Sequence, residues 1–69
     1  MRHITLNGLN YQVLDESNPV MLLQRDGQKL FYDPRTADPE QPVTQVADHV
    51  TSAIGALFYV VYLRTKERS

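Results

Sequence analysis

The fold is decided by one stretch of sequence, Val20-Met21-Leu22-Leu23-Gln24-Arg25-Asp26-Gly27-Gln28-Lys29-Leu30-Phe31-Tyr32. The dipeptide Asp26-Gly27 lies between two apolar runs and predicts a two-residue hairpin turn, because both turn positions need a positive φ. This turn places Leu23 opposite Leu30 and Leu22 opposite Phe31. Away from the turn, both faces of the hairpin are then apolar, which is typical of strands that are covered on both sides.

A second hairpin precedes it. Asn7-Gly8 separates two runs in which apolar and polar residues alternate, between Ile4 and Val13. The same turn type pairs Leu6 with Leu9 and Ile4 with Tyr11. Residues 1–33 therefore predict four strands in series, arranged as an antiparallel meander.

The rest of the chain predicts a loop and one helix. Residues 34–42 contain three prolines, which favour a stiff loop. Residues 43–66 then show a helical period, with apolar side chains on one stripe that is expected to cover the sheet. The stripe consists of Val43, Val46, Ala47, Val50, Ile54, Leu57 and Val61. The expected fold is a single α+β domain of order ββββα.

The small size of the domain indicates a second chain. A domain of 69 residues buries only about 60% of the surface that its unfolded form exposes. Domains of this size commonly add disulfides, a metal or a partner subunit. There is no cysteine, and His3 and His49 lie far apart in sequence, so no metal site and no cofactor is expected. Of these three means of stabilisation, a partner subunit remains, and the simplest form is a homodimer.

A second apolar stripe on the helix marks the expected interface. It begins after Ser52, and Gly55 lies within it although glycine costs about 1 kcal/mol in a helix. We predict that the partner contacts this stripe together with one sheet face, through Gly55, Ala56, Tyr59, Val60, Tyr62, Leu63, Val20, Leu22 and Phe31. Three alternatives would remove this stripe from solvent. It could be buried within the monomer, covered by a second copy of the chain or covered by a different, larger protein.

The charge balance argues against duplex DNA as the partner. Seven basic and eight acidic residues give a net charge of −1, whereas duplex binders carry a basic excess. The alternative function is binding of a single-stranded nucleic acid or an acidic partner through the sheet aromatics and the basic tail. Its residues would be Arg2, Arg25, Lys29, Arg64, Lys66 and Arg68.

Catalysis is not predicted. Asp48, His49 and Ser52 resemble a catalytic triad in composition, but on a helix the first two side chains point about 100° apart. Asp15 and Glu16 are adjacent acids that we expect in a turn between the hairpins, where they would not form an acid–base pair.

The remaining features concern location and role. The N-terminal residues show no signal-like apolar run, and the longest apolar stretch is too short for a membrane span, so a cytoplasmic protein is expected. A small domain of near-neutral charge without an active site fits a regulator or inhibitor of a larger protein. Phages and other mobile elements encode many proteins of this kind.

Overall fold

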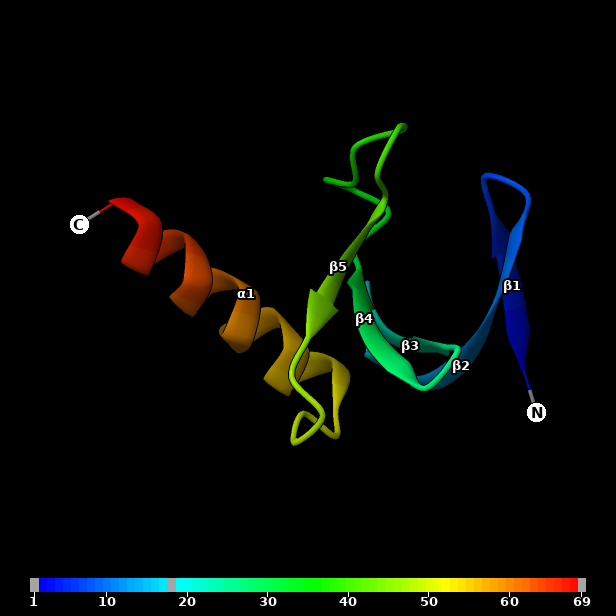
Figure 1. Cartoon of the computed structure of the whole chain (residues 1–69), viewed down its shortest axis with the longest axis horizontal. Coiled ribbons are helices and arrows are strands. Elements are labelled where there is room, and N and C mark those ends of the chain that lie inside the picture. The colour runs from blue at the N-terminus through cyan, green and yellow to red at the C-terminus, as the bar shows by residue number, and fades with distance from the viewer. Residues whose placement is uncertain (1, 18, 69) are drawn as a thin grey trace.

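A computed structural model describes residues 2–17 and 19–68, which form one curved antiparallel sheet followed by a helix (Figure 1). Neighbours in sequence are neighbours in the sheet, so the strand order is β1-β2-β3-β4-β5. The elements are β1 (His3–Leu6), β2 (Leu9–Ser17), β3 (Val20–Arg25), β4 (Gln28–Tyr32), β5 (Val43–Val46) and α1 (Ala53–Arg68). The α+β meander with one C-terminal helix is confirmed, with five strands in place of four.

Both predicted hairpins are confirmed, including their registers. Leu6 pairs with Leu9, and Leu23 pairs with Leu30. The two turns adopt the left-handed backbone that the sequence requires, with φ between 52° and 80° at Asn7-Gly8 and Asp26-Gly27. Local turn chemistry therefore sets the alignment of four of the five strands.

The predicted helix boundary at Val43 is wrong, because residues 43–46 form strand β5. This strand pairs with β4, with Val43 opposite Tyr32 and Val46 opposite Lys29. Three residues apart, these valines would share one side of a helix, whereas in a strand they lie on opposite faces, and here both faces of the sheet are apolar. The unpaired edge of β4 decides between the two, and β-branched Val43 and Thr44 favour the extended form.

The two faces of the sheet carry separate apolar clusters. The cluster beneath α1 is built around Val20, Leu22 and Phe31, with Val46 and Val50 from the end of the sheet and the following loop. The opposite, concave face carries buried residues Tyr11, Leu23 and Leu30, packed against partly buried Ile4, Leu6, Val13, Met21, Tyr32 and Val43. The division of β3 and β4 into two apolar faces follows the prediction from their sequence.

The proline-containing loop reaches the tip of the β1–β2 hairpin. Asp33 organises its start, since its carbonyl accepts hydrogen bonds from the backbone N–H groups of Thr36 and Ala37. At the far end, the Asn7 side chain donates to the carbonyl of Pro39 at 2.9 Å. The tip of the β1–β2 hairpin is thereby tied to the loop between β4 and β5.

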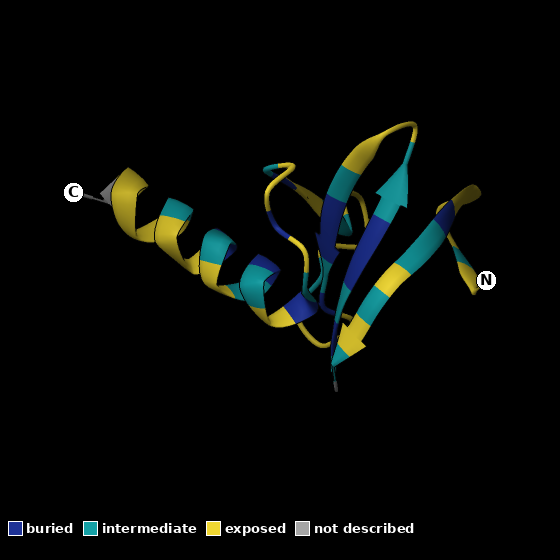
Figure 2. Cartoon of the chain, turned by 90° about the horizontal axis from the view of Figure 1, so that it is seen from below, coloured by how far each residue is buried: buried dark blue, intermediate teal, exposed yellow. Residues whose placement is uncertain are grey.

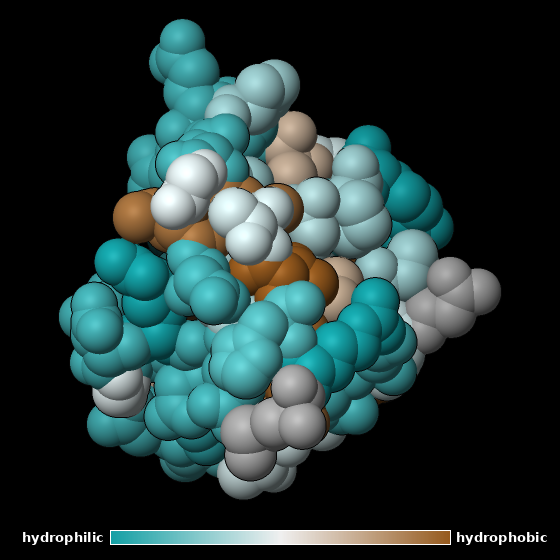
Figure 3. Space-filling model, turned by 90° about the vertical axis from the view of Figure 1, so that its right-hand side faces the viewer, coloured by the Kyte–Doolittle hydropathy of each residue, from teal (hydrophilic) through white to brown (hydrophobic). Residues whose placement is uncertain are grey.

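Helix α1 packs on the sheet only by its N-terminal half. The helix extends away from the strands, so the N- and C-terminal ends of the chain lie at opposite ends of the molecule (Figure 1). Burial decreases along it in the same direction, from buried residues at its start to exposed ones at its end (Figure 2). From the β1 side the surface is mainly hydrophilic, with a narrow apolar band across it (Figure 3).

Candidate protein-interaction surface

The position of α1 is set by two polar groups at its N-terminus. The Ser52 hydroxyl accepts a hydrogen bond from the N–H of Gly55 at 3.0 Å, which is the geometry of an N-cap. The Asp15 carboxylate accepts from the N–H of Ala53 at 2.7 Å. A carboxylate at this end also interacts favourably with the helix dipole. The start of the helix is thus tied to β2.

A β-bulge brings Asp15 to the helix side of the sheet. The register of β2 against β3 shifts between Val13 and Asp15, so that Asp15 lies opposite Leu22, on the helix side. In a regular strand Leu14 would take this position, and Asp15 would face the concave side. The sequence-based placement of Asp15 and Glu16 in a turn is wrong, since both lie within β2.

The most deeply buried residues on the sheet-facing side of α1 are small, and the partly buried Leu57 and Tyr59 pack beside them. Ala53 and Ala56 are fully buried and Val60 is 4% exposed, with all three packed in the cluster around Leu22. Their spacing places them on one side of the helix. Small side chains let the helix backbone lie close to the sheet.

The opposite side of α1 is apolar and exposed. Its large side chains remain open to solvent, at 45% for Ile54, 68% for Phe58, 49% for Val61 and 59% for Tyr62. We call these four residues the outer face of α1. The largest exposed apolar patch of a typical monomer is about 300–600 Å² and often marks an interaction site.

A shallow groove borders the outer face. It has a volume of about 560 Å³ and runs between the helix and the loop before it. At one wall the rings of His49 and Tyr59 meet edge to face, with centroids 6.1 Å apart. The groove is lined by His49, Val50, Thr51, Ser52, Gly55, Phe58, Tyr59 and Tyr62.

The structure divides the predicted interface residues into two groups. Tyr62 is exposed, and Gly55, Tyr59 and Leu63 are partly exposed, so these four are open to a partner. The structure instead buries the five other predicted contacts in the monomer core beneath the helix, so they are not open to a partner in this chain: Ala56, Val60, Val20, Leu22 and Phe31. The sheet face expected to meet a partner is instead covered by α1 itself.

Sequence reasoning missed Ile54, Phe58 and Val61 as surface residues. The helical period from Val43 predicts that Ile54 and Val61 face the sheet, whereas both are exposed in the structure. The error follows from the helix boundary, because a helix that starts at Val43 places a different side against the sheet. The signal that would have corrected it is Ser52, a good N-cap residue directly before Ala53.

The basic residues of the alternative function whose side chains the structure describes are not gathered into one patch. Arg2 directly precedes β1 and Arg64 lies in α1, and these two elements are at opposite sides of the molecule (Figure 1). Lys29 donates to the carbonyls of Asp48 and Val50 at 2.8 and 2.7 Å. Arg25 lies over the ring of Tyr11, 5.9 Å from its centroid, and its side chain is 3.8 Å from the Asp26 carboxylate. Lys66 is exposed, and the side chain of Arg68 lies outside the described residues.

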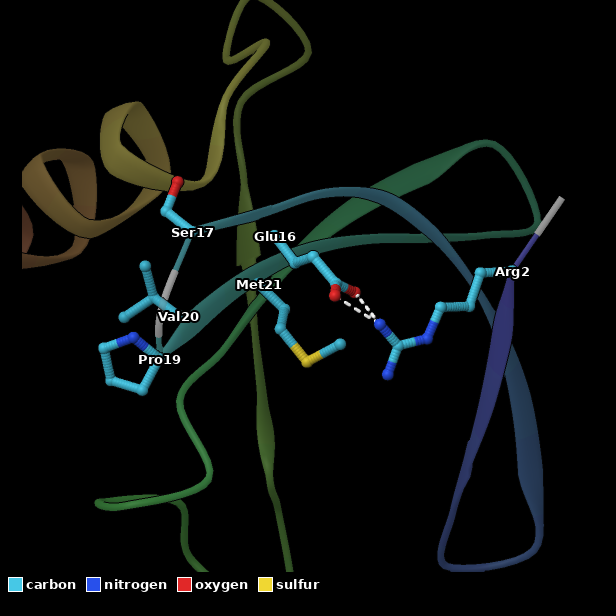
Figure 4. Close-up of a pocket in the computed structure, with 6 residues that line it drawn as sticks. All are labelled: Arg2, Glu16, Ser17, Pro19, Val20 and Met21. Carbon is cyan, nitrogen blue, oxygen red and sulfur yellow. Dashed lines mark hydrogen bonds and ion pairs between the residues drawn. The ribbon is translucent and has the colours of Figure 1, made fainter.

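Arg2 lines a hollow of about 340 Å³ beside the connection between β2 and β3 (Figure 4). Here Arg2 and Glu16 form an ion pair that spans the hollow. Met21 and Pro19 supply its apolar wall. The charges of Arg2 and Glu16 neutralise each other. A charged ligand would therefore have to break this ion pair to bind in the hollow.

Two residues of the triad-like group, Ser52 and His49, make contacts within the fold. Ser52 is occupied as the helix cap, and His49 packs against Tyr59. Within residues 2–17 and 19–68, no group of three His, Cys, Asp or Glu residues is placed to hold a metal ion. The side chain and the backbone N–H of Arg35 both donate to Asp33, which lowers the pKa of that carboxyl.

Among the described residues, α1 is the only helix, and it lacks the length and hydropathy of a membrane span. We compared the chain with protein-family models, with curated proteins and with solved structures, and none of the three comparisons found a match.

Proposed function

We propose that this chain is a non-catalytic protein-interaction module that binds its partner through the outer face of α1. The observation that carries the proposal is the exposure of Phe58 and Tyr62, at 68% and 59%, on a helix whose other side is buried. Burial of one such aromatic side chain provides about 1.5–3 kcal/mol. A partner that covers both rings would therefore gain substantial free energy.

The composition of the outer face supports a protein partner. It contains two aromatic and two aliphatic side chains and no charged residue. Interface cores are depleted in charge and enriched in aromatic residues, and tyrosine is a frequent hot-spot residue. The adjoining groove gives space for an apolar side chain of the partner beside Tyr62.

The biological role that fits such a module is regulation or inhibition of a larger protein, of the kind that phages and mobile elements encode. Its binding energy would come from α1, because the aromatic rings on the concave side of the sheet are already buried or half-buried. The absence of cysteine is compatible with a reducing compartment, and we place this role in the cytoplasm.

Site-specific photo-crosslinking tests the proposal. The photoreactive residue benzoylphenylalanine replaces Tyr62 in one variant and Leu9 in a control, since Leu9 is also exposed, at 43%, but lies on β2. In the cells that express the protein, we expect adducts from position 62 and few from position 9. A Phe58→Asp change in the same chain should remove the adducts from position 62.

Two results would contradict the proposal. Equal crosslinking from positions 62 and 9 would show that the outer face has no preferred role. Adducts that persist after Phe58→Asp would show contact without dependence on the apolar face. An adduct with another copy of the chain counts as a protein partner in this test.

A further inference from the structure

Resting on the proposed interaction role of the outer face, we propose that its partner is a second copy of this chain, paired through an antiparallel contact between two α1 helices. This pairing follows from the spacing of the exposed residues, from their sizes and from the distribution of charge along α1.

The exposed residues of α1 form a seam with helix-pairing periodicity. Ile54, Phe58, Val61 and Thr65 are separated by four, three and four residues, which is the alternation of a coiled-coil seam. The Thr65 hydroxyl donates to the carbonyl of Val61 at 3.0 Å. Its polar group is thus satisfied within the helix, and the seam presents no unpaired donor to a partner.

The sizes along the seam favour an antiparallel pair. A two-fold axis between Phe58 and Val61 places the larger Phe58 of one copy opposite the smaller Val61 of the other. It also places Ile54 opposite Thr65. A parallel pair would instead set Phe58 against Phe58 and leave the smaller residues facing each other, which packs less evenly.

The groove beside the seam accommodates an aromatic ring in this arrangement. The axis that pairs Phe58 with Val61 brings Tyr62 of the second copy close to Gly55 of the first. Gly55 is part of the groove, and a side chain there would already crowd the Ser52 hydroxyl, 3.0 Å from the position of a Cβ. The lack of a side chain at Gly55 thus serves both the helix cap and the space for the ring.

The charge along α1 favours the same direction. Residues 64–68 carry three basic residues and one acidic residue, whereas the first turn carries no acidic residue and the preceding loop carries exposed Asp48. A parallel pair would bring two basic ends together. An antiparallel pair separates the basic ends and turns each toward the Asp48 side of the other copy. It also sets the two helix dipoles antiparallel, which is the favourable arrangement.

The outer face is also accessible and of adequate size. It lies on the side of α1 away from the sheet, so a second helix can reach it without meeting the strands. From the usual area of such side chains, the four residues expose roughly 400 Å² per chain. This is about half of the roughly 800 Å² per partner of a standard interface. With the groove and seam neighbours included, we expect a dimer of micromolar affinity.

Sedimentation equilibrium of the intact chain tests the pairing. From about 1 μM to 1 mM, we expect the mass to rise from 7.9 kDa toward twice that value. Phe58→Asp should weaken the dimer at least 30-fold, as expected for a central aromatic residue. Leu9→Asp, at a comparably exposed apolar position on β2, should leave the dimer unchanged. Tyr62→Asp repeats the test if Phe58→Asp does not fold.

Disulfide trapping tests the direction in a chain that has no cysteine of its own. Ile54→Cys and Thr65→Cys are oxidised separately and as a mixture. An antiparallel pair gives mainly the mixed disulfide, because it brings positions 54 and 65 together and keeps two copies of position 54 about 16 Å apart. Mainly homodisulfides would overturn the antiparallel arrangement.

The two proposals fail differently. A chain that remains at 7.9 kDa up to 1 mM overturns the self-pairing. If crosslinks from position 62 to another protein still depend on Phe58, the proposed interaction function stands without it. If those crosslinks are absent as well, both proposals fail.

Discussion

The Asp15 carboxylate accepts a hydrogen bond from the backbone N–H of Ala53 across 38 residues of sequence, at 2.7 Å. This contact joins the middle of the sheet to the first residue of α1. It depends on the bulge at Leu14, which turns Asp15 to the helix side of β2. The orientation of α1, and with it the exposure of Phe58 and Tyr62, therefore depends on a residue far from the helix.

Replacement of Asp15 should destabilise the start of α1. Asp15→Ala removes an acceptor and a negative charge at the helix N-terminus, and we expect a loss of about 1 kcal/mol in the free energy of unfolding. Urea denaturation measures the loss, and hydrogen exchange should accelerate at the amide of Ala53. Asp15→Asn keeps an acceptor oxygen and should restore part of the loss.

The neighbouring acid provides the control for this prediction. Glu16 forms an exposed ion pair with Arg2, and such pairs contribute little. Glu16→Gln should therefore change the free energy of unfolding by less than Asp15→Ala. Equal effects of the two substitutions would contradict the role given to the Asp15–Ala53 contact.

Val60 and Val61 are adjacent in sequence and should respond differently to truncation. Val60 is 4% exposed and packs in the cluster beneath α1, whereas Val61 is 49% exposed. Val60→Ala should cost about 2 kcal/mol, and Val61→Ala about 0.5 kcal/mol or less. Thermal unfolding at submicromolar concentration, below the dissociation constant expected for the dimer, measures both in the monomer. A larger effect at Val61 would reverse the assigned orientation of the helix.

Lys29 should stabilise the loop between β5 and α1. Its ammonium group donates to the carbonyls of Asp48 and Val50 at 2.8 and 2.7 Å, and hydrogen bonds from a charged donor typically contribute about 1.5–3 kcal/mol. Lys29→Met keeps the apolar stem and removes both bonds, so we expect a loss of about 2 kcal/mol in urea denaturation. Gln28→Met, at an exposed neighbouring position, is the control and should have little effect.

Asp33 should make stability depend on pH in the acid range. Hydrogen bonds from the Arg35 side chain, and then from its backbone N–H, lower the pKa of Asp33 below its ordinary value of 3.8. The folded state thus favours the ionised carboxyl, and its stabilising effect is complete above pH 3.8 and is lost as the pH falls below it.

Substitution of the carboxyl tests this dependence. Asp33→Asn should lower the free energy of unfolding at pH 7 and make it change less steeply between pH 4 and pH 2. Denaturation curves at several pH values measure the slope. An unchanged slope in the variant would assign the acid sensitivity to other carboxylates of the chain.

The hairpins were predictable because their determinants are local. Two residues at each turn, Asn7-Gly8 and Asp26-Gly27, adopt a positive φ that sets the register of the flanking strands. The division of Leu22 and Leu23 between two apolar faces follows from the alternation of a strand. No contact with a distant residue is needed for either conclusion.

The outer face of α1 was not predictable in the same way. Val43 and Val46 fit a helical stripe, and only the open edge of β4 makes them a strand. Once residues 43–46 leave the helix, Ala53, Ala56 and Val60 take the side toward the sheet. The apolar residues that remain, with Phe58 among them, turn outward.

The sequence by itself therefore determined the α+β class, the two hairpins, their registers and the surplus of apolar residues near the C-terminus, because turn geometry and side-chain alternation act over a few residues. Tertiary structure alone decided the fifth strand, the start of α1 at Ala53 and the residues that face solvent. These depend on contacts such as Asp15 with Ala53, whose partners are brought together only when the sheet has formed.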